Sequence, residues 1–111
     1  MKKIAFVIPW YGESISGGAE SACRDIVKHL LKSDTQVEIL TTCVKDFNSD
    51  WNVNFHKKGI EMINNLLVRR FKVRKRNTPL FNDINYKLIN NIKVTREEEE
   101  LFFREMINSP D

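Results

Sequence analysis

Residues 4–20 read Ile-Ala-Phe-Val-Ile-Pro-Trp-Tyr-Gly-Glu-Ser-Ile-Ser-Gly-Gly-Ala-Glu, and no other stretch of the chain says as much about its architecture. Residues 4–8 are apolar throughout, which predicts a strand covered on both faces. A polar loop follows and closes on Gly17-Gly18. Across residues 19–32 the apolar positions recur at helical spacing, so we expect the first helix there.

The glycine spacing separates this junction from two common nucleotide-binding loops. The glycines are Gly12, Gly17 and Gly18, whereas a dinucleotide fingerprint places Gly-x-Gly-x-x-Gly directly after the strand. A Gly-Lys-Ser/Thr phosphate loop is absent as well. Backbone N–H groups at a helix N-terminus can still bind a phosphate. The alternative is that the glycine pair only begins the helix.

Further strands are predicted downstream. Residues 37–42 form the second strand, and a strand–helix–strand unit of this kind is parallel and right-handed. Residues 60–63 and 66–73 flank Asn64-Asn65, a pair that suits a two-residue hairpin turn. Residues 44–58 lack a clear period and carry aromatic residues, so we expect an ordered loop.

Two more helices are expected in the last third of the chain. Thr78 is the predicted cap of one, with Pro79 at its first position. Thr95 and Glu98 have the spacing of a capping box for the other, which we expect to end at Ser109-Pro110. The predicted fold class is α/β, with a mostly parallel, Rossmann-like sheet flanked by helices and one hairpin.

The opening segment resembles that of family 4 glycosyltransferases, the retaining enzymes with two facing Rossmann-like domains. The residues that carry the resemblance are Ile8-Pro9-Trp10-Tyr11-Gly12 and Gly17-Gly18-Ala19-Glu20. Residues 37–43, 68–71 and 97–101 also fit the N-terminal domain of that family. The resemblance implies sugar transfer with retention from a nucleotide-sugar donor to a glycan or lipid-linked acceptor, without a metal ion or other cofactor.

The resemblance also implies substrate-binding residues. Gly17 and Gly18 match the loop that meets the phosphates of the donor, and Trp10, Tyr11 and Gly12 match the segment that leads to the floor of the cleft. Glu20 matches the acidic residue that opens the first helix, for which we expect a capping role before a catalytic one.

Length and composition limit what the chain can do alone. Its 111 residues are enough for one domain, residues 1–111, and fewer than the N-terminal domain of that family usually has. We therefore expect an inactive fragment that lacks the C-terminal, donor-binding domain and pairs as a homodimer. No apolar run is long enough to span a membrane, and Cys23 and Cys43 fit no metal spacing, so we expect buried thiols in a cytoplasmic protein.

The net charge of +3 is unevenly distributed. Residues 69–76 hold six basic side chains, which suggests an alternative function: a non-catalytic module that recognises an anionic partner. The simplest interpretation is a solvated edge strand. The second interpretation of this segment is peripheral contact with the inner face of an anionic membrane. Nucleic acid is not expected, because only Phe71 interleaves the charges.

No catalytic residue or metal site is predicted. His29 and His56 are expected at the surface, away from any acid–base cluster. Glu97 and Glu105 have the spacing of the donor-binding glutamates of the family, but four consecutive glutamates make such a match easy to find by chance. Acidic residues in the first turn of a helix have a simpler role in complementing its dipole.

Overall fold

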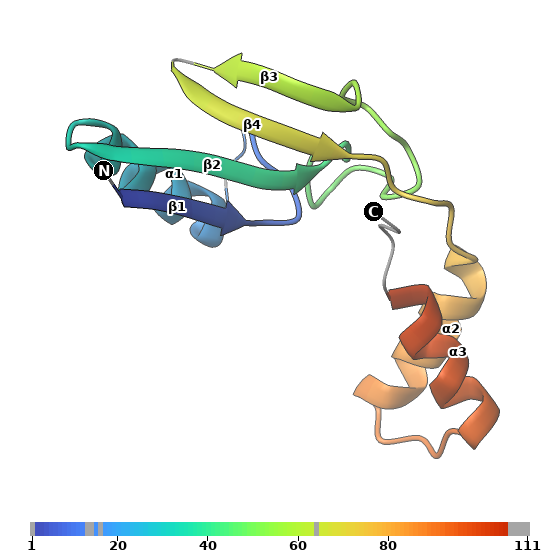
Figure 1. The fold of residues 1–111 in the computed structure, drawn as a ribbon. Helices are drawn as coiled ribbons and strands as arrows, with labels where there is room; N and C mark the ends of the chain where they lie inside the picture. Colours follow the sequence, from blue (N-terminus) through green and yellow to red (C-terminus); the bar gives the residue numbers. More distant parts are fainter. Residues whose placement is uncertain (1, 13–14, 16, 64, 107–111) are drawn as a thin grey trace.

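A computed structural model describes residues 2–12, 15, 17–63 and 65–106 of the chain. The elements occur in the order β1, α1, β2, β3, β4, α2, α3 (Figure 1). Their bounds are β1 Lys2–Val7, α1 Gly18–Leu31, β2 Thr35–Thr42, β3 Gly59–Ile63, β4 Leu66–Phe71, α2 Thr78–Ile89 and α3 Arg96–Met106. The predicted order of strands and helices is confirmed; the fourth strand ends two residues earlier than expected, and the end proposed at Ser109-Pro110 lies outside the described residues.

The strands form one sheet in the order β1-β2-β4-β3. β1, β2 and β4 are parallel, with Ile4 opposite Val37 and Ile39 opposite Val68. β3 is antiparallel to β4, and Asn65 adopts a φ of 67° at the turn between them. The expectation of an α/β fold with a mostly parallel sheet and one hairpin is confirmed.

The core lies between α1 and one face of the sheet. Strand alternation directs the inward residues of β1, β2 and β4 to this face, and α1 contributes Cys23 and Val27. Both cysteines are buried and free, and burial raises the pKa of each thiol. The buried members of the core are Tyr11, Cys23, Val27, Val37, Ile39, Leu66 and Val68.

The second face of the sheet, called here the open face, differs from the prediction. The first strand was expected to be covered on both faces, yet Val7 is 82% exposed. The reason is that α1 alone packs on the sheet, whereas α2 and α3 pack chiefly on each other. Figure 1 shows this pair beyond the carboxyl ends of the parallel strands rather than on a face of the sheet. Flanking of the sheet by helices is thus limited to one side.

The helical pair α2–α3, called here the arm, has its own small core. Phe81 and Phe102 stack with ring centroids 4.8 Å apart, and Ile84 is buried. The predicted capping box is confirmed by reciprocal hydrogen bonds between Thr95 and Glu98, of 3.2 and 3.1 Å. The cap of α2 is Asn77 rather than Thr78, because the Asn77 side chain accepts a hydrogen bond from the N–H of Leu80.

The linker between β4 and the arm is held by two asparagines of the preceding loop. The Asn54 side chain bonds both the N–H and the carbonyl of Val73, at 2.8 and 3.1 Å. The Asn52 side chain does the same for Arg76, at 2.9 and 3.2 Å, and also donates to Thr78. These bonds fix the direction in which the arm leaves the sheet.

Candidate functional site

The predicted site residues lie where β1 leads into α1, at the carboxyl edge of the sheet. This edge is tied to β2, because Thr42 donates from its N–H and its hydroxyl to the carbonyl of Pro9, at 3.4 and 2.5 Å. In open α/β sheets ligands bind outside the carboxyl ends of the strands. The position of the junction therefore agrees with a binding role.

Gly17 makes room for a carboxylate. A Cβ at Gly17 would lie 1.9 Å from Oε2 of Glu20, so the Glu20 side chain rests against this glycine. The same carboxylate accepts a 2.5 Å hydrogen bond from the indole N–H of Trp10. Glu20 thus places its negative charge in the first turn of α1, where the helix dipole stabilises it. A phosphate that approached Gly17 would meet this charge.

Gly18 and Gly12 have different surroundings. A Cβ at Gly18, the first residue of α1, would have no heavy atom within 4 Å. The carbonyl of Gly12 accepts a 3.0 Å hydrogen bond from Arg24, which also donates to the carbonyl of Ile15 and to the hydroxyl of Ser21. Arg24 therefore anchors the loop to α1.

Tyr11 belongs to the core rather than to the open edge. It is buried, and its carbonyl accepts a 2.9 Å hydrogen bond from Arg70. Arg70 is a fully buried side chain that also bonds the carbonyl of Thr42 and forms a 3.0 Å ion pair with Glu61. One guanidinium thereby joins the loop after β1, the end of β2 and the hairpin strand β3.

Three aromatic rings meet at the carboxyl edge. Trp10 lies 5.8 Å from Phe47 and 5.3 Å from Trp51, and Phe47 lies 5.7 Å from Trp51, measured between ring centroids. Only Trp10 among them was predicted at the site, and the loop that carries Phe47 and Trp51 was expected to be ordered. We call these three residues the aromatic cluster.

A groove of about 820 Å³ runs from the aromatic cluster onto the open face. Its volume is within the range of ligand-binding pockets. Most of its lining residues are apolar, and Arg76 is the charged residue among them. Residues lining it include Val7, Trp10, Leu40, Thr41, Thr42, Trp51, Phe71, Arg76 and Met106.

Arg76 is the charged residue of the groove. Its guanidinium lies 5.1 Å from the ring centroid of Trp51 and 4.3 Å from that of Phe81. Burial lowers the pKa of this guanidinium, while Glu105 acts in the opposite direction. Within the part of the chain that the structure describes, the buried Nε of Arg76 and the hydroxyl of Thr41 have no hydrogen-bond partner. Both atoms are buried, and Thr41 lies on the same side of β2 as the core residues Val37 and Ile39, so Arg76 is the polar side chain that faces the groove.

The histidines lie outside the groove. His29 is exposed on α1, as predicted. His56 is half-buried rather than at the surface. Its backbone N–H donates to the carbonyl of Cys43, and burial lowers the pKa of its imidazole. Among the described residues there is no group of three or more His, Cys, Asp or Glu side chains that could hold a metal ion.

The basic segment makes contacts within the chain. Arg69 pairs with Glu38 at 2.8 Å, Arg70 is buried, and Arg74 donates to the carbonyl of Arg104 at 3.0 Å. Arg76 donates to the carbonyl of Met106 and lies against aromatic rings. The segment is therefore a set of internal anchors more than a row of solvated charges. No helix in the described part of the chain is long and apolar enough to cross a membrane.

Comparison of the chain with protein-family models, with curated proteins and with solved structures gave no significant match.

Proposed function

We propose that the chain is the acceptor-side domain of a retaining glycosyltransferase of the family 4 type, in which a Rossmann-like sheet presents a groove to a sugar acceptor. The observation that carries this proposal is the aromatic cluster at the carboxyl edge, next to Arg76. Aromatic faces cover the apolar faces of sugar rings, and adjacent polar groups fix orientation. Arg76 supplies such a group here.

The acceptor side is favoured over the donor side by charge. The Glu20 carboxylate rests against Gly17, so the glycine pair presents a negative group where a donor phosphate would approach. A helix N-terminus alone contributes only about 0.3–1 kcal/mol toward an anion at an exposed site. In this proposal a second domain binds the donor, so the chain alone does not turn over substrate. The complete enzyme works in the cytoplasm without a metal ion.

The alternative function, recognition of an anionic partner or membrane by residues 69–76, has less support. Arg69, Arg70, Arg74 and Arg76 all make ion pairs, hydrogen bonds or ring contacts within the chain. The charges of Arg69 and Arg70 are balanced by Glu38 and Glu61, which reduces the attraction of this segment for an anionic partner.

The test is a binding titration of the 111-residue chain. Oligosaccharides are added while tryptophan fluorescence is recorded, because Trp10 and Trp51 line the groove. We expect saturable quenching by at least one oligosaccharide, and neither saturable binding of free UDP or GDP in the micromolar range nor release of nucleotide from nucleotide-sugars. Trp51→Ala should abolish the response to sugar, whereas Phe55→Ala, which removes an exposed ring that does not line the groove, should retain it.

Two results would contradict the proposal. One is the absence of a response to any oligosaccharide in a chain that is folded by circular dichroism. The other is micromolar binding of UDP or GDP that survives Trp51→Ala and is lost in Gly18→Val, since this result would assign the junction to the donor.

A further inference from the structure

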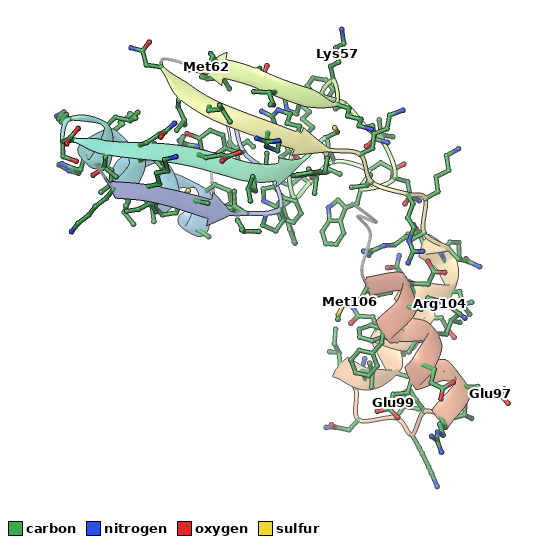
Figure 2. All side chains as sticks on the ribbon, viewed as in Figure 1. Lys57, Met62, Glu97, Glu99, Arg104 and Met106 are labelled. Carbon is green, nitrogen blue, oxygen red and sulfur yellow. The ribbon has the colours of Figure 1, made fainter. Side chains whose placement is uncertain are left out.

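The groove continues from the aromatic cluster along an apolar strip on the open face of the sheet. This strip consists of Val7, Leu40 and Phe71, which all line the groove. Val7 is directly opposite Leu40 in the sheet, and it is 82% exposed. Met106 lines the same groove, and Figure 2 shows it at the end of α3 nearer the sheet. The arm therefore supplies one wall of the groove and leaves the strip accessible to a ligand.

An ion pair limits the strip on the amino side of the strands. Glu38 and Arg69 are joined by a 2.8 Å contact between their side chains. Arg69 is opposite Leu40 in the register of β2 and β4, and strand alternation places both charged side chains on the open face. A ligand on the strip therefore has an apolar part that ends before this pair, and its other end points to the aromatic cluster.

The polar side chains beside the strip are already bonded within the chain. The hydroxyl of Thr42 donates to a backbone carbonyl at 2.5 Å. The indole N–H groups of Trp10 and Trp51 donate within the chain at 2.5 and 2.9 Å. A sugar on the strip would leave its hydroxyls without partners, which costs free energy, whereas a hydrocarbon chain has no such groups. The strip is thus suited to an alkyl chain.

Arg76 carries a positive charge beside the aromatic cluster. Its guanidinium lies 5.1 Å from the ring centroid of Trp51 and donates to the carbonyl of Met106 at 3.3 Å. Among the described residues no carboxylate forms an ion pair with Arg76, and burial lowers its pKa more than Glu105 raises it. A guanidinium held against aromatic rings binds phosphate through its remaining N–H groups.

From these observations we infer that the ligand of the groove is an anionic amphiphile, with its hydrocarbon chain on the apolar strip and a phosphate on Arg76. Charge complementarity assigns the head group, since the positive charge of Arg76 has no paired carboxylate among the described residues. The choice of phosphate rests on the proposed function, in which a sugar lies at the aromatic cluster. A phosphodiester joins a sugar to an alkyl chain and stays negative, whereas a carboxylate loses its charge when it is esterified. The acceptor is then a lipid-linked sugar, and a free oligosaccharide occupies the aromatic end alone.

Titration of the 111-residue chain with n-alkyl phosphates, below their critical micelle concentrations, tests the inference. Tryptophan fluorescence reports binding, because Trp10 and Trp51 line the groove. From hexyl to decyl phosphate we expect the affinity to rise by up to about fourfold for each methylene group that the strip covers. Inorganic phosphate lacks the chain, and decyltrimethylammonium has the chain with the opposite charge. Each should bind at least about tenfold more weakly than decyl phosphate.

A pair of arginine variants tests the head group. Arg76→Gln should weaken binding of decyl phosphate about tenfold and leave that of decyltrimethylammonium no weaker. Arg74→Gln is the matched control, because Arg74 and Arg76 each donate to a backbone carbonyl near the end of α3 but Arg74 does not line the groove. If loosening of α3 caused the loss of affinity, both variants would show it.

A pair of apolar-to-polar variants tests the chain site. Val7→Asn should weaken binding of decyl phosphate about tenfold and reduce the gain in affinity per methylene group. Met62→Asn changes an exposed apolar residue of β3 that does not line the groove, so its affinities should equal those of the wild type. Circular dichroism checks the fold of each variant.

Several outcomes would overturn the inference: affinity independent of chain length, equal binding of the phosphate and the ammonium compound, or equal effects of Arg76→Gln and Arg74→Gln. A chain that sediments as a dimer and binds no alkyl phosphate would assign the strip to a second copy instead. Saturable binding of an oligosaccharide without preference for decyl phosphate would refute the amphiphile and leave the proposed function standing. Preference for decyl phosphate without any response to oligosaccharides would support the amphiphile and contradict the proposed function.

Discussion

Gly17 and Gly18 are neighbours with opposite steric requirements. In Gly17→Ala the new methyl group would displace the Glu20 carboxylate, because Oε2 lies 1.9 Å from the Cβ position, and the Trp10–Glu20 hydrogen bond would be lost. The displaced atom is the end of a flexible side chain, so we expect the free energy of unfolding to fall only by about 0.5–1.5 kcal/mol for the lost hydrogen bond, together with a shift in tryptophan emission. Urea unfolding followed by fluorescence measures both quantities.

Gly18→Ala is the matched control for this prediction. The added Cβ meets no heavy atom within 4 Å, and alanine favours a helix more than glycine does. Its stability should equal or exceed that of the wild type by up to about 1 kcal/mol. Equal losses in the two variants would show that the Glu20 contact is not what Gly17 provides.

Arg70 stabilises the fold through backbone groups rather than through its ion pair. Arg70→Met should leave the carbonyls of Tyr11 and Thr42 without their buried donor and lower the free energy of unfolding by about 1–3 kcal/mol. Glu61→Gln should cost no more than about 1 kcal/mol, because the Glu61 side chain is 51% exposed and the pair is screened on that side. Chemical denaturation of both variants checks which one loses more unfolding free energy. A larger loss of unfolding free energy in Glu61→Gln than in Arg70→Met would contradict the prediction.

His56 gives the fold a pH dependence of defined sign. Burial lowers the pKa of its imidazole below the ordinary 6.5; the Arg70 charge acts in the same direction and Glu61 opposes it. The folded state therefore takes up the proton less readily than the unfolded state. The contribution of His56 to stability is complete above about pH 6.5 and declines as the pH falls below that value.

Unfolding free energies measured from about pH 8 down to about pH 5 test this prediction. The decline should be smaller in His56→Gln, whereas His29→Gln, at an exposed position on α1, should follow the wild type. A profile of His56→Gln that coincides with that of the wild type would be inconsistent with the assigned role.

At the scale of elements, the side-chain hydrogen bonds of Asn52 and Asn54 to the linker, called here the linker clamp, decide where the arm lies. Asn52→Ala removes both backbone bonds to Arg76 and the bond to Thr78, so we expect a loss of about 1–3 kcal/mol and faster proteolysis within residues 72–77. Asn82→Ala, at an exposed position on α2, is the control and should leave both quantities unchanged. Equal proteolysis of the two variants would indicate that the clamp does not hold the linker.

Local signals in the sequence predicted the elements well. The capping box of Thr95 and Glu98 and the turn at Asn65 depend on neighbouring residues, and both occur in the structure. The cap of α2 was misplaced by one residue, because Asn77 and Thr78 are both good capping residues and only the geometry selects Asn77. The Asn52 and Asn54 clamp joins positions 19 to 26 residues apart, and no local pattern predicts such a contact.

At the scale of the whole molecule, the parallel β1–α1–β2 unit and the β3–β4 hairpin were predicted, but the position of β4 beside β2 and the covering of the faces of the sheet were not. An apolar strand indicates that both faces can be covered; it does not identify the covering element. The aromatic cluster was foreseen only in part, since Trp10 and Trp51 are 41 positions apart. The buried position of Arg70 could have been predicted from the sequence, because Arg70 continues the inward alternation of Leu66 and Val68 in β4.

The contacts within the arm have a kinetic consequence. Phe81 and Phe102 are 21 residues apart, and the helices they join are consecutive, whereas Lys2 pairs with Thr35 and Glu38 with Leu67 across the sheet. Loop closure costs less entropy for the nearer pair, so the arm should form before the parallel strands β1, β2 and β4 pair during folding. Amide protons of α2 and α3 should then exchange through separate opening events of low free energy, while those of β2 and β4 exchange only when the whole chain unfolds.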